Sequence, residues 1–318
     1  MGVSIQKRTP KNHGAVIRRT SMYRALYLML IPGLFFLFIY KFIPLYGLLI
    51  GFKDFNIFLG DNPFQAIALS EWVGLEHFKR LFSMPDFGRV LANTLIINTM
   101  KIIFLFPLPI LSAIMLNEIR CIPYKKTAQT LIYIPYFFSW VVVFGIFYSL
   151  LGSQGIVNEF LNKLGIGSIS FFTDQGIFRW LLVATEGWKE NGWYTVIYLA
   201  ALTGIDPELY EAAKIDGANR LKQIMHVTLP GLFSTIILML IMKIGYILDT
   251  GFEQILVMYN PTVYSVADVI QTYVYRIGLG QMDYSLGTAL GLFNSVIAFI
   301  LIVGSNAASK RLVSRSIW

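Results

Sequence analysis

Six stretches of mainly apolar residues recur along the chain, and each is long enough to cross a membrane as a helix. About 20 apolar residues span the ~30 Å hydrocarbon core of a bilayer. The six stretches cover residues 25–50, 90–116, 128–151, 177–202, 229–248 and 286–305. Polar segments separate them. The pattern therefore predicts an all-α polytopic membrane protein with six transmembrane helices.

The composition supports this interpretation and excludes other classes. Of the 318 residues, 56% are hydrophobic and 14% are charged, whereas a soluble globular chain has roughly 45–50% and about 25%. Intrinsic disorder needs the opposite balance. The single cysteine, Cys121, excludes a secreted domain stapled by disulfides. A water-soluble fold of this size could not bury so many apolar residues, which argues against a soluble enzyme.

The net charge of +8 is distributed unevenly between the predicted sides of the membrane. Fifteen of the 26 Lys and Arg residues fall in the two termini and in loops 117–127 and 203–228. Because positive residues collect on the cytoplasmic side, both termini are predicted to be cytoplasmic. We divide the chain into a basic tail (1–24), a six-span domain (25–306) and a C-terminal tail (307–318). The excess of positive charge thus indicates the orientation of the chain in the membrane and not a nucleic-acid partner.

The loop of residues 205–230 is predicted to fold as a helical hairpin on the cytoplasmic side. Asp206 suits an N-cap and Pro207 suits the first helical position. Gly217 can end this helix in the left-handed conformation, Asn219 can start a second short helix, and Pro230 is expected to open the fifth span. The small residues of this loop permit close approach of another protein, but an ordinary structured loop would look the same.

This loop resembles the EAA loop of ABC importer permeases. Glu211-Ala212-Ala213, then Gly217, then Val227-Thr228-Leu229-Pro230 keep the spacing of that pattern throughout, with Val227 in place of Ile. The extended form over residues 211–218 is typical of the carbohydrate-importer branch. Residues 73–78, 93–94 and 134–136 resemble other parts of the family. The layout is most similar to oligosaccharide permeases of the lipoprotein/polysaccharide type.

The resemblance implies a type I ABC importer permease fold in the plasma or inner membrane of a bacterium. It also implies that the loop docks into a cleft of a cytoplasmic ATPase. The expected ATPase-coupling residues are Glu211, Ala212, Ala213, Asp216 and Gly217. The implied partners are a homologous second permease, two ATPase subunits and an extracellular or periplasmic sugar-binding protein.

We expect no cofactor, no metal site and no catalytic residue in this chain. The sequence contains no Gly-x-x-x-x-Gly-Lys-Ser/Thr phosphate loop, whose backbone would cradle nucleotide phosphates. ATP and Mg²⁺ are therefore expected on the partner ATPase. The chain is expected to be a transport subunit and not an enzyme.

Charged residues within the predicted spans are the candidates for a substrate site, because charges are costly in a bilayer. Glu186, Lys189 and Glu190 have the spacing of one helical face, and Lys243 could pair with one of the carboxylates. The cluster could fix helix packing or could line the translocation cavity. The resemblance favours the cavity, and the expected substrate-binding set is Tyr136, Trp140, Glu186, Trp188, Lys189, Glu190, Lys243 and Tyr246.

The predicted function is ATP-driven import of oligosaccharides by alternating access. Aromatic faces suit sugar rings, and Lys189 and Lys243 could hold the carboxylate of a uronate-containing fragment. One alternative is an ABC permease for a non-sugar solute, which would share the loop and differ in the cavity. Another is a proton-coupled secondary transporter that uses the intramembrane Glu and Lys residues, although the inverted repeats typical of that class are not seen. An intramembrane enzyme lacks any supporting motif.

Overall fold

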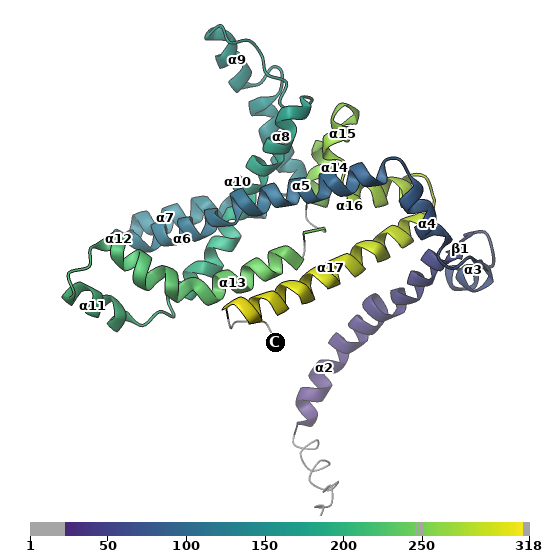
Figure 1. Cartoon of the computed structure of the whole chain (residues 1–318), viewed down its shortest axis with the longest axis horizontal. Helices are drawn as coiled ribbons and strands as arrows, with labels where there is room; N and C mark the ends of the chain where they lie inside the picture. Colours follow the sequence, from purple (N-terminus) through teal and green to yellow (C-terminus); the bar gives the residue numbers. More distant parts are fainter. Residues whose placement is uncertain (1–22, 246, 249–250, 314–318) are drawn as a thin grey trace, which may run out of the picture.

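The computed structural model describes residues 23–245, 247–248 and 251–313, and these are almost entirely helical (Figure 1). The α-helices are α2 (Arg24–Leu37), α3 (Pro63–Leu69), α4 (Glu76–Ser83), α5 (Phe87–Leu105), α6 (Pro107–Glu118), α7 (Ile122–Tyr133), α8 (Trp140–Leu151), α9 (Ile156–Lys163), α10 (Gln175–Leu202), α11 (Pro207–Ile215), α12 (Arg220–Gln223), α13 (Leu229–Gly245), α14 (Phe252–Met258), α15 (Tyr264–Ala267), α16 (Ile270–Val274) and α17 (Tyr284–Val313). Two-residue strands β1 (Lys53–Asp54) and β2 (Glu71–Trp72) pair antiparallel, with Lys53 opposite Trp72. The predicted all-α class is confirmed.

Helices of π or 3₁₀ geometry join several of these elements. They are η1 (Phe38–Phe42), η2 (Ile43–Phe52), η3 (Ile134–Phe137), η4 (Ile224–Thr228), η5 (Pro261–Val263) and η6 (Tyr275–Gly280). The first predicted span is the continuous run α2–η1–η2. The second predicted span is α5 followed directly by α6.

Five helical segments of the described chain are long and apolar enough to cross a membrane. They are Leu26–Phe52, Phe87–Glu118, Trp140–Lys163, Arg220–Gly245 and Tyr284–Ala307. The predicted fourth span corresponds to α10, whose 28 residues extend about 42 Å at 1.5 Å per residue. This helix carries four charged residues and is not among the five. The number of six spans and the side of the termini therefore stay predictions.

The prediction of a single helix over residues 128–151 is wrong. The chain forms α7, then the short η3, and then a new helix, α8. Pro135 lies within η3, where its ring and missing N–H disfavour a continuous α-helix. Ser139 then starts α8, because its side chain accepts a hydrogen bond from the Val142 amide (3.4 Å). The break places the backbone carbonyl of Tyr136 beside α10.

The fifth span also begins earlier than predicted. A helical run starts at Arg220 and continues through α12, η4 and α13, so Pro230 lies inside it and does not open it. A proline removes one backbone hydrogen bond and clashes with the preceding turn. The π-helical turn η4 lies directly before this position and widens the helix there, which accommodates the ring.

Helix α10 lies at the centre of the structure and packs against α5, α6, α13 and η3. Gly192 permits the contact with the end of α7, because a Cβ atom there would come within 2.3 Å of the Ile132 carbonyl oxygen. On the far side, the Asn93 side-chain amide donates to the carbonyls of Ser265 (3.0 Å) and Asp268 (3.2 Å). These contacts attach α5 to the segment that connects α14 and α16.

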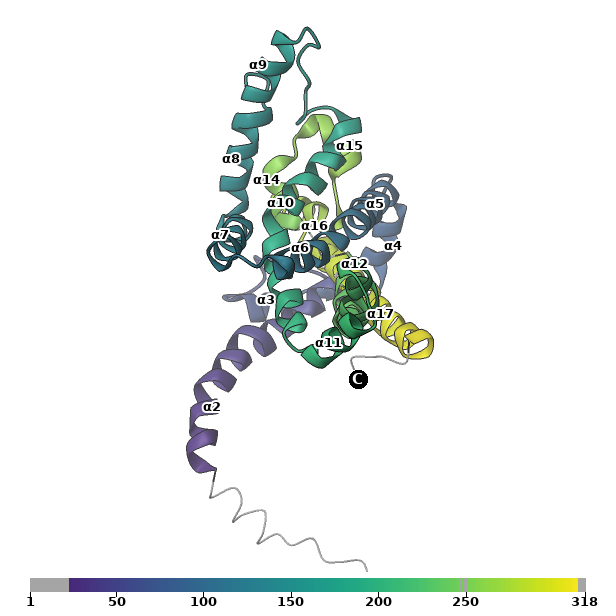
Figure 2. The ribbon, with the colours of Figure 1, turned by 90° about the vertical axis from the view of Figure 1, so that its left-hand side faces the viewer.

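Three buried apolar clusters form the core, and two of them include residues of α10. One joins α10 to α14 and α15, another joins α4 and α5 to α16 and α17, and the third joins α6 to α10 and α13. Helix α2 leads away from this core in both views (Figures 1 and 2). The hairpin formed by α11 and α12 and the segment from β1 to α4 lie at opposite ends of the molecule (Figure 1).

Candidate functional site

The coupling hairpin, defined as residues 205–230, has the local structure that its sequence predicts. The Asp206 side chain accepts a hydrogen bond from the Glu208 amide (3.0 Å) and caps α11. Gly217 has a φ angle of +76°. The amide of Gly217 donates to the Lys214 carbonyl and that of Ala218 to the Ala213 carbonyl. This pair of bonds is a Schellman motif, which requires a left-handed residue at its turn.

A second helix returns the chain to the membrane domain. Asn219 caps α12 by accepting from the Lys222 amide (2.9 Å), as predicted. The Tyr210 hydroxyl lies 3.0 Å from the Thr228 hydroxyl, and Gln223 donates to the Ala218 carbonyl (2.9 Å). The first contact holds α11 against η4, and the second holds the turn of the hairpin against α12.

The outward face of α11 carries part of the expected coupling set. At 100° per residue, Glu208, Glu211, Ala212 and Ile215 point to one side of the helix, and all four are exposed. Ile215 is 86% exposed, which is unusual for an isoleucine in a well-formed helix. Asp216 and Gly217 are also exposed, whereas Ala213 is half-buried. Four of the five predicted coupling residues are therefore exposed, and Ala213 is not.

Within the helical core lies a membrane charge cluster, which consists of Lys101, Glu186, Lys189, Glu190 and Lys243. Glu186 is buried and contacts two lysines: Lys101 Nζ lies 2.5 Å from Oε2, and Lys243 Nζ lies 3.7 Å from Oε1. Lys101 also donates to the Gln254 side chain (2.7 Å). This arrangement joins α5, α10, α13 and α14 through charged groups.

Glu186, Lys189 and Glu190 leave the continuous helix α10 on one side, as their spacing predicts, but Lys189 belongs to a second part of the cluster because its partners differ from those of Glu186. The Lys189 ammonium donates to the Tyr136 carbonyl (3.1 Å) and to Glu190 (3.2 Å). It also lies 5.0 Å from the Tyr136 ring centre and 5.2 Å from that of Trp140. The break between α7 and α8 creates this environment, because it brings η3 against α10 beside Lys189.

Aromatic side chains extend the site along α10. The rings of Tyr136 and Trp193 stack at 4.8 Å and 10°, and Trp188, which is 40% exposed, packs against Phe138 and Phe147. The predicted Tyr136 and Trp140 are thus brought together at Lys189, whereas Trp188 has other ring partners. Tyr246 lies outside the described residues.

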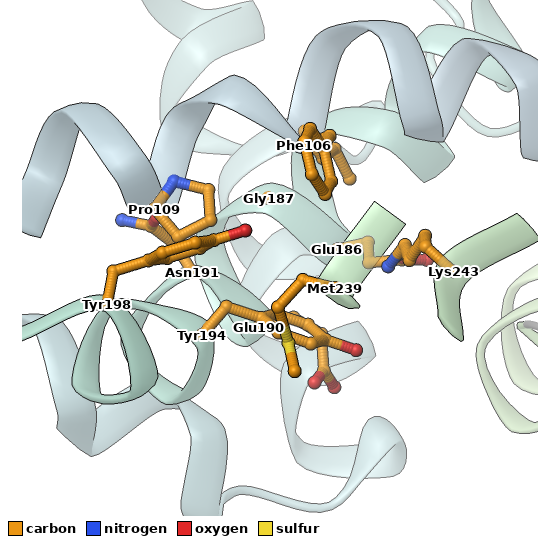
Figure 3. Close-up of a pocket in the computed structure, with 11 residues that line it drawn as sticks. Phe106, Pro109, Glu186, Gly187, Glu190, Asn191, Tyr194, Tyr198, Met239 and Lys243 are labelled. Carbon is orange, nitrogen blue, oxygen red and sulfur yellow. The ribbon is translucent and has the colours of Figure 1, made fainter. Parts of the chain in front are cut away.

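A pocket lies beside the Glu186 part of the cluster, between α6, α10 and α13 (Figure 3). Its lining includes Glu186, Glu190, Asn191, Tyr194 and Lys243. In Figure 3 the side chains of Lys243 and Glu186 meet at one side of the pocket. The space open to water-sized spheres is about 30 Å³, enough for one or two waters. A sugar ring would therefore require the surrounding helices to separate.

The sequence analysis missed several residues of this site. Lys101 is the nearer partner of Glu186, although only Lys243 was expected to pair with a carboxylate. Its charge inside an apolar span was a usable signal, but the spacing of 85 residues gives no hint of the pairing. Gln254 and Asn191 carry no sequence signal of their own, because a single amide residue shows neither its partner nor its side of the helix.

Comparisons with known proteins show the family of the chain. The family model described as "Binding-protein-dependent transport system inner membrane component" matches residues 105–316. The chain is 46% identical over 287 residues to "Protein LplB" of Bacillus subtilis, which covers 90% of this chain and 88% of that protein. It is 44% identical over 294 residues to the "Polygalacturonan/rhamnogalacturonan transport system permease protein YteP" of the same organism, over 92% and 90% of the two chains.

The chain also resembles solved structures of one bacterial ABC transporter. A chain in the crystal structure of the transporter "involved in the import of the acidic polysaccharide alginate" superposes with a TM-score of 0.84 and 37% identity, over 94% of this chain and 99% of that one. A chain in its "complex with alginate pentasaccharide-bound periplasmic protein" gives a TM-score of 0.85 and 36% identity, with the same coverage.

Proposed function

Because the chain belongs to the inner membrane components of binding-protein-dependent transport systems, we propose that it is the permease subunit of an importer that moves acidic oligosaccharides into the cytoplasm. The chain is a multi-pass membrane protein and a transport subunit, not itself an enzyme. The observation that carries the proposal is the coupling hairpin, which presents an exposed Glu-Ala-Ala helix and a Schellman turn directly before a long apolar helix.

The coupling hairpin is proposed to dock into a cytoplasmic ATPase, which binds ATP and Mg²⁺. Glu211, Ala212 and Ile215 would form the central contact, with Asp216 and Gly217 at its edge. Covering the exposed Ile215 would remove apolar surface from water. Ala213 would act mainly within the hairpin, because it is half-buried and accepts the Schellman bond. The small side chain of Ala212 lets the partner approach the helix closely.

Movement of the hairpin would be transmitted to the membrane through α13. Tyr210 and Gln223 fasten the hairpin to the beginning of the α12–η4–α13 run, and this run leads to Lys243 in the membrane charge cluster. Closure of two ATPase copies on ATP binding would shift α13 against α10 and open the site outward, and hydrolysis would reset it. This cycle is alternating access.

The substrate class is proposed from the cluster and from the relatives. The names of the similar proteins refer to polygalacturonan, rhamnogalacturonan and the acidic polysaccharide alginate. Three lysines lie within the membrane charge cluster of this chain, and two of them, Lys189 and Lys243, lie next to aromatic rings that suit sugar faces. Together these observations support uronate-containing oligosaccharides over neutral ones.

The remaining partners are a second, homologous permease and a binding protein outside the membrane. The binding protein follows from the family and from the structural relative solved with a periplasmic protein. Residues 26–38 of the first apolar run are all exposed in this chain, so this part is available to lipid and to a second permease.

Reconstitution of the complete transporter in proteoliposomes tests the proposal. We expect import of a labelled galacturonate trisaccharide to require ATP, and substitution Ala212→Trp to lower both import and ATPase association at least tenfold. The matched control is Lys214→Trp, which places the same bulk on the flank of α11. Normal import by the Ala212→Trp variant would contradict the docking role. Import that persists without the ATPase and collapses with the proton gradient would favour a secondary transporter.

A further inference from the structure

We propose that Lys243 is the residue that binds the carboxylate of the substrate, and that Lys101 and Lys189 are held in structural pairs. This inference rests on the proposed import of acidic oligosaccharides and assigns its charge selectivity to one side chain. Among the described residues, the membrane charge cluster contains three lysines and two carboxylates. The geometry distinguishes the three lysines by their partners, their exposure and their access to the pocket.

Lys101 is committed to Glu186. The two side chains are 1% and 7% exposed, and their charged atoms are 2.5 Å apart. The Lys101 ammonium also donates to Gln254, whose own amide donates to the Leu182 carbonyl (2.7 Å) and the Thr185 hydroxyl (2.8 Å). A buried ion pair persists when its remaining donors and acceptors are satisfied in this way. Removing either member would leave an uncompensated charge.

Lys189 is committed to Glu190 and to the break between α7 and α8. Its side chain is 8% exposed, and its ammonium contacts Glu190, the Tyr136 carbonyl and two aromatic rings. It does not line the pocket of Figure 3, whereas Glu190 does. Lys189 therefore offsets the negative charge of Glu190 from outside the pocket. Glu190 then repels an entering anion less.

Lys243 has no comparable partner in the described part of the chain. Its Nζ lies 3.7 Å from Glu186 Oε1, longer than a hydrogen bond, and Glu186 is already paired with Lys101. Its other contact is the ring of Tyr194, 4.9 Å away. Lys243 is also the most exposed of the three lysines, at 16%, and it lines the pocket.

These contacts are consistent with a Lys243 ammonium that leaves Glu186 and binds a substrate carboxylate. A lysine in a dry environment gains most from a carboxylate that has no other cation. A uronate carboxylate in the opened pocket would provide this, while the Tyr194 ring and the Asn191 amide meet the sugar. Because α13 carries Lys243 and continues into the coupling hairpin, the movement that opens the pocket would also withdraw Lys243 from Glu186.

Import measurements with a charged and a neutral version of one sugar test the assignment. The probes are a galacturonate trisaccharide and its methyl ester, offered to the complete transporter in proteoliposomes. We expect Lys243→Gln to lower import of the acid about tenfold or more, the scale of a charge-assisted hydrogen bond, and to lower import of the ester by a clearly smaller factor, because the ester has no carboxylate for Lys243 to bind. Lys243→Arg should retain most import of the acid.

The matched control is Lys189→Gln, which removes an equal charge from the same cluster and should affect both probes by a similar factor. Equilibrium binding of both probes to the purified complex, without the binding protein, gives a second readout that the binding protein cannot bias. If Lys243→Gln lowers both probes equally, or neither, in both readouts, the assignment is wrong while the importer function stands. If the wild-type transporter neither imports nor binds the acid, the proposed substrate class itself fails.

Discussion

The coupling hairpin and the membrane charge cluster differ in the sequence separation of the contacts that hold them together. Every hydrogen bond that shapes the turn of the hairpin joins residues no more than five positions apart, such as Asn219 to Lys222 or Gln223 to Ala218. In the cluster, by contrast, Lys101 and Glu186 come from different helices, as do Glu186 and Lys243. One region is a local structure that offers a surface, and the other exists only when four helices pack correctly.

This difference suits the two proposed roles. A docking element must keep its shape when its partner moves, and local caps keep that shape without help from the rest of the fold. A substrate site in an alternating-access protein must change when helices move. Contacts between different helices respond to such movement, because a small shift of α13 alters the distance from Lys243 to Glu186.

The largest expected effect is that of removing Lys101. Lys101→Met leaves the buried Glu186 carboxylate with only the distant Lys243, and loss of one member of a buried ion pair typically costs about 3–5 kcal/mol. We expect a clear fall in the thermal unfolding midpoint of the purified protein. The double variant Lys101→Met/Glu186→Gln should recover part of this loss. An unchanged midpoint for the single variant would show that the cluster does not hold the helices together.

The next effect concerns the turn of the coupling hairpin. Gly217→Val places a β-branched residue at a φ of +76°, which costs about 1–2 kcal/mol of backbone strain. A Cβ atom there meets no other atom within 4 Å, so the damage should stay local. We expect normal membrane insertion but loss of import and of stimulated ATP hydrolysis.

Gly217→Asn serves as the control for this turn, because asparagine tolerates the left-handed conformation better than most residues. It adds a side chain at the same point while keeping the Schellman motif. Import by the Asn variant close to that of the wild type would assign the defect of the Val variant to backbone conformation. Equal loss in both variants would instead indicate that the partner surface excludes any side chain there.

A smaller effect is expected at the start of α11. Asp206→Ala removes the acceptor for the Glu208 amide, and loss of an N-cap typically costs about 1 kcal/mol. Amide hydrogen exchange over residues 207–215 should become faster by roughly fivefold, with little change in the midpoint of global unfolding. The conservative variant Asp206→Ser should preserve protection. If Asp206→Ala lowers global stability as much as Lys101→Met does, the hairpin is not the independent local structure described above.

The smallest effect tests the attachment of the hairpin to the membrane helix. Tyr210→Phe removes the hydrogen bond to Thr228, which contributes on the order of 0.5–1.5 kcal/mol. We expect ATPase association to persist and import per ATP hydrolysed to fall, because the hairpin would move less firmly with α13. Thr228→Val removes the same bond from the other side and should reproduce the change. An unaltered ratio in both variants would show that this bond does not transmit movement.

The sequence by itself determined the elements whose causes are local. Runs of apolar residues located the membrane helices, and Asp206, Gly217 and Asn219 fixed the caps and turn of the coupling hairpin. It was less successful where neighbouring elements interact: Pro135 divided the third predicted span, and the π-helical turn η4 let a helix pass through Pro230. A hydropathy pattern records burial in lipid but not the continuity of the backbone.

Only the tertiary structure decided which charges meet. The sequence placed Glu186, Lys189, Glu190 and Lys243 within apolar spans, but it gave no hint that Lys101 pairs with Glu186 or that Lys189 contacts the break between α7 and α8. Packing of α5, α13 and η3 around α10 divided them into two groups and left Lys243 at the pocket. The physical reason is that the strength of a charge pair depends on the distance and burial of its atoms, and both are set by how distant segments pack.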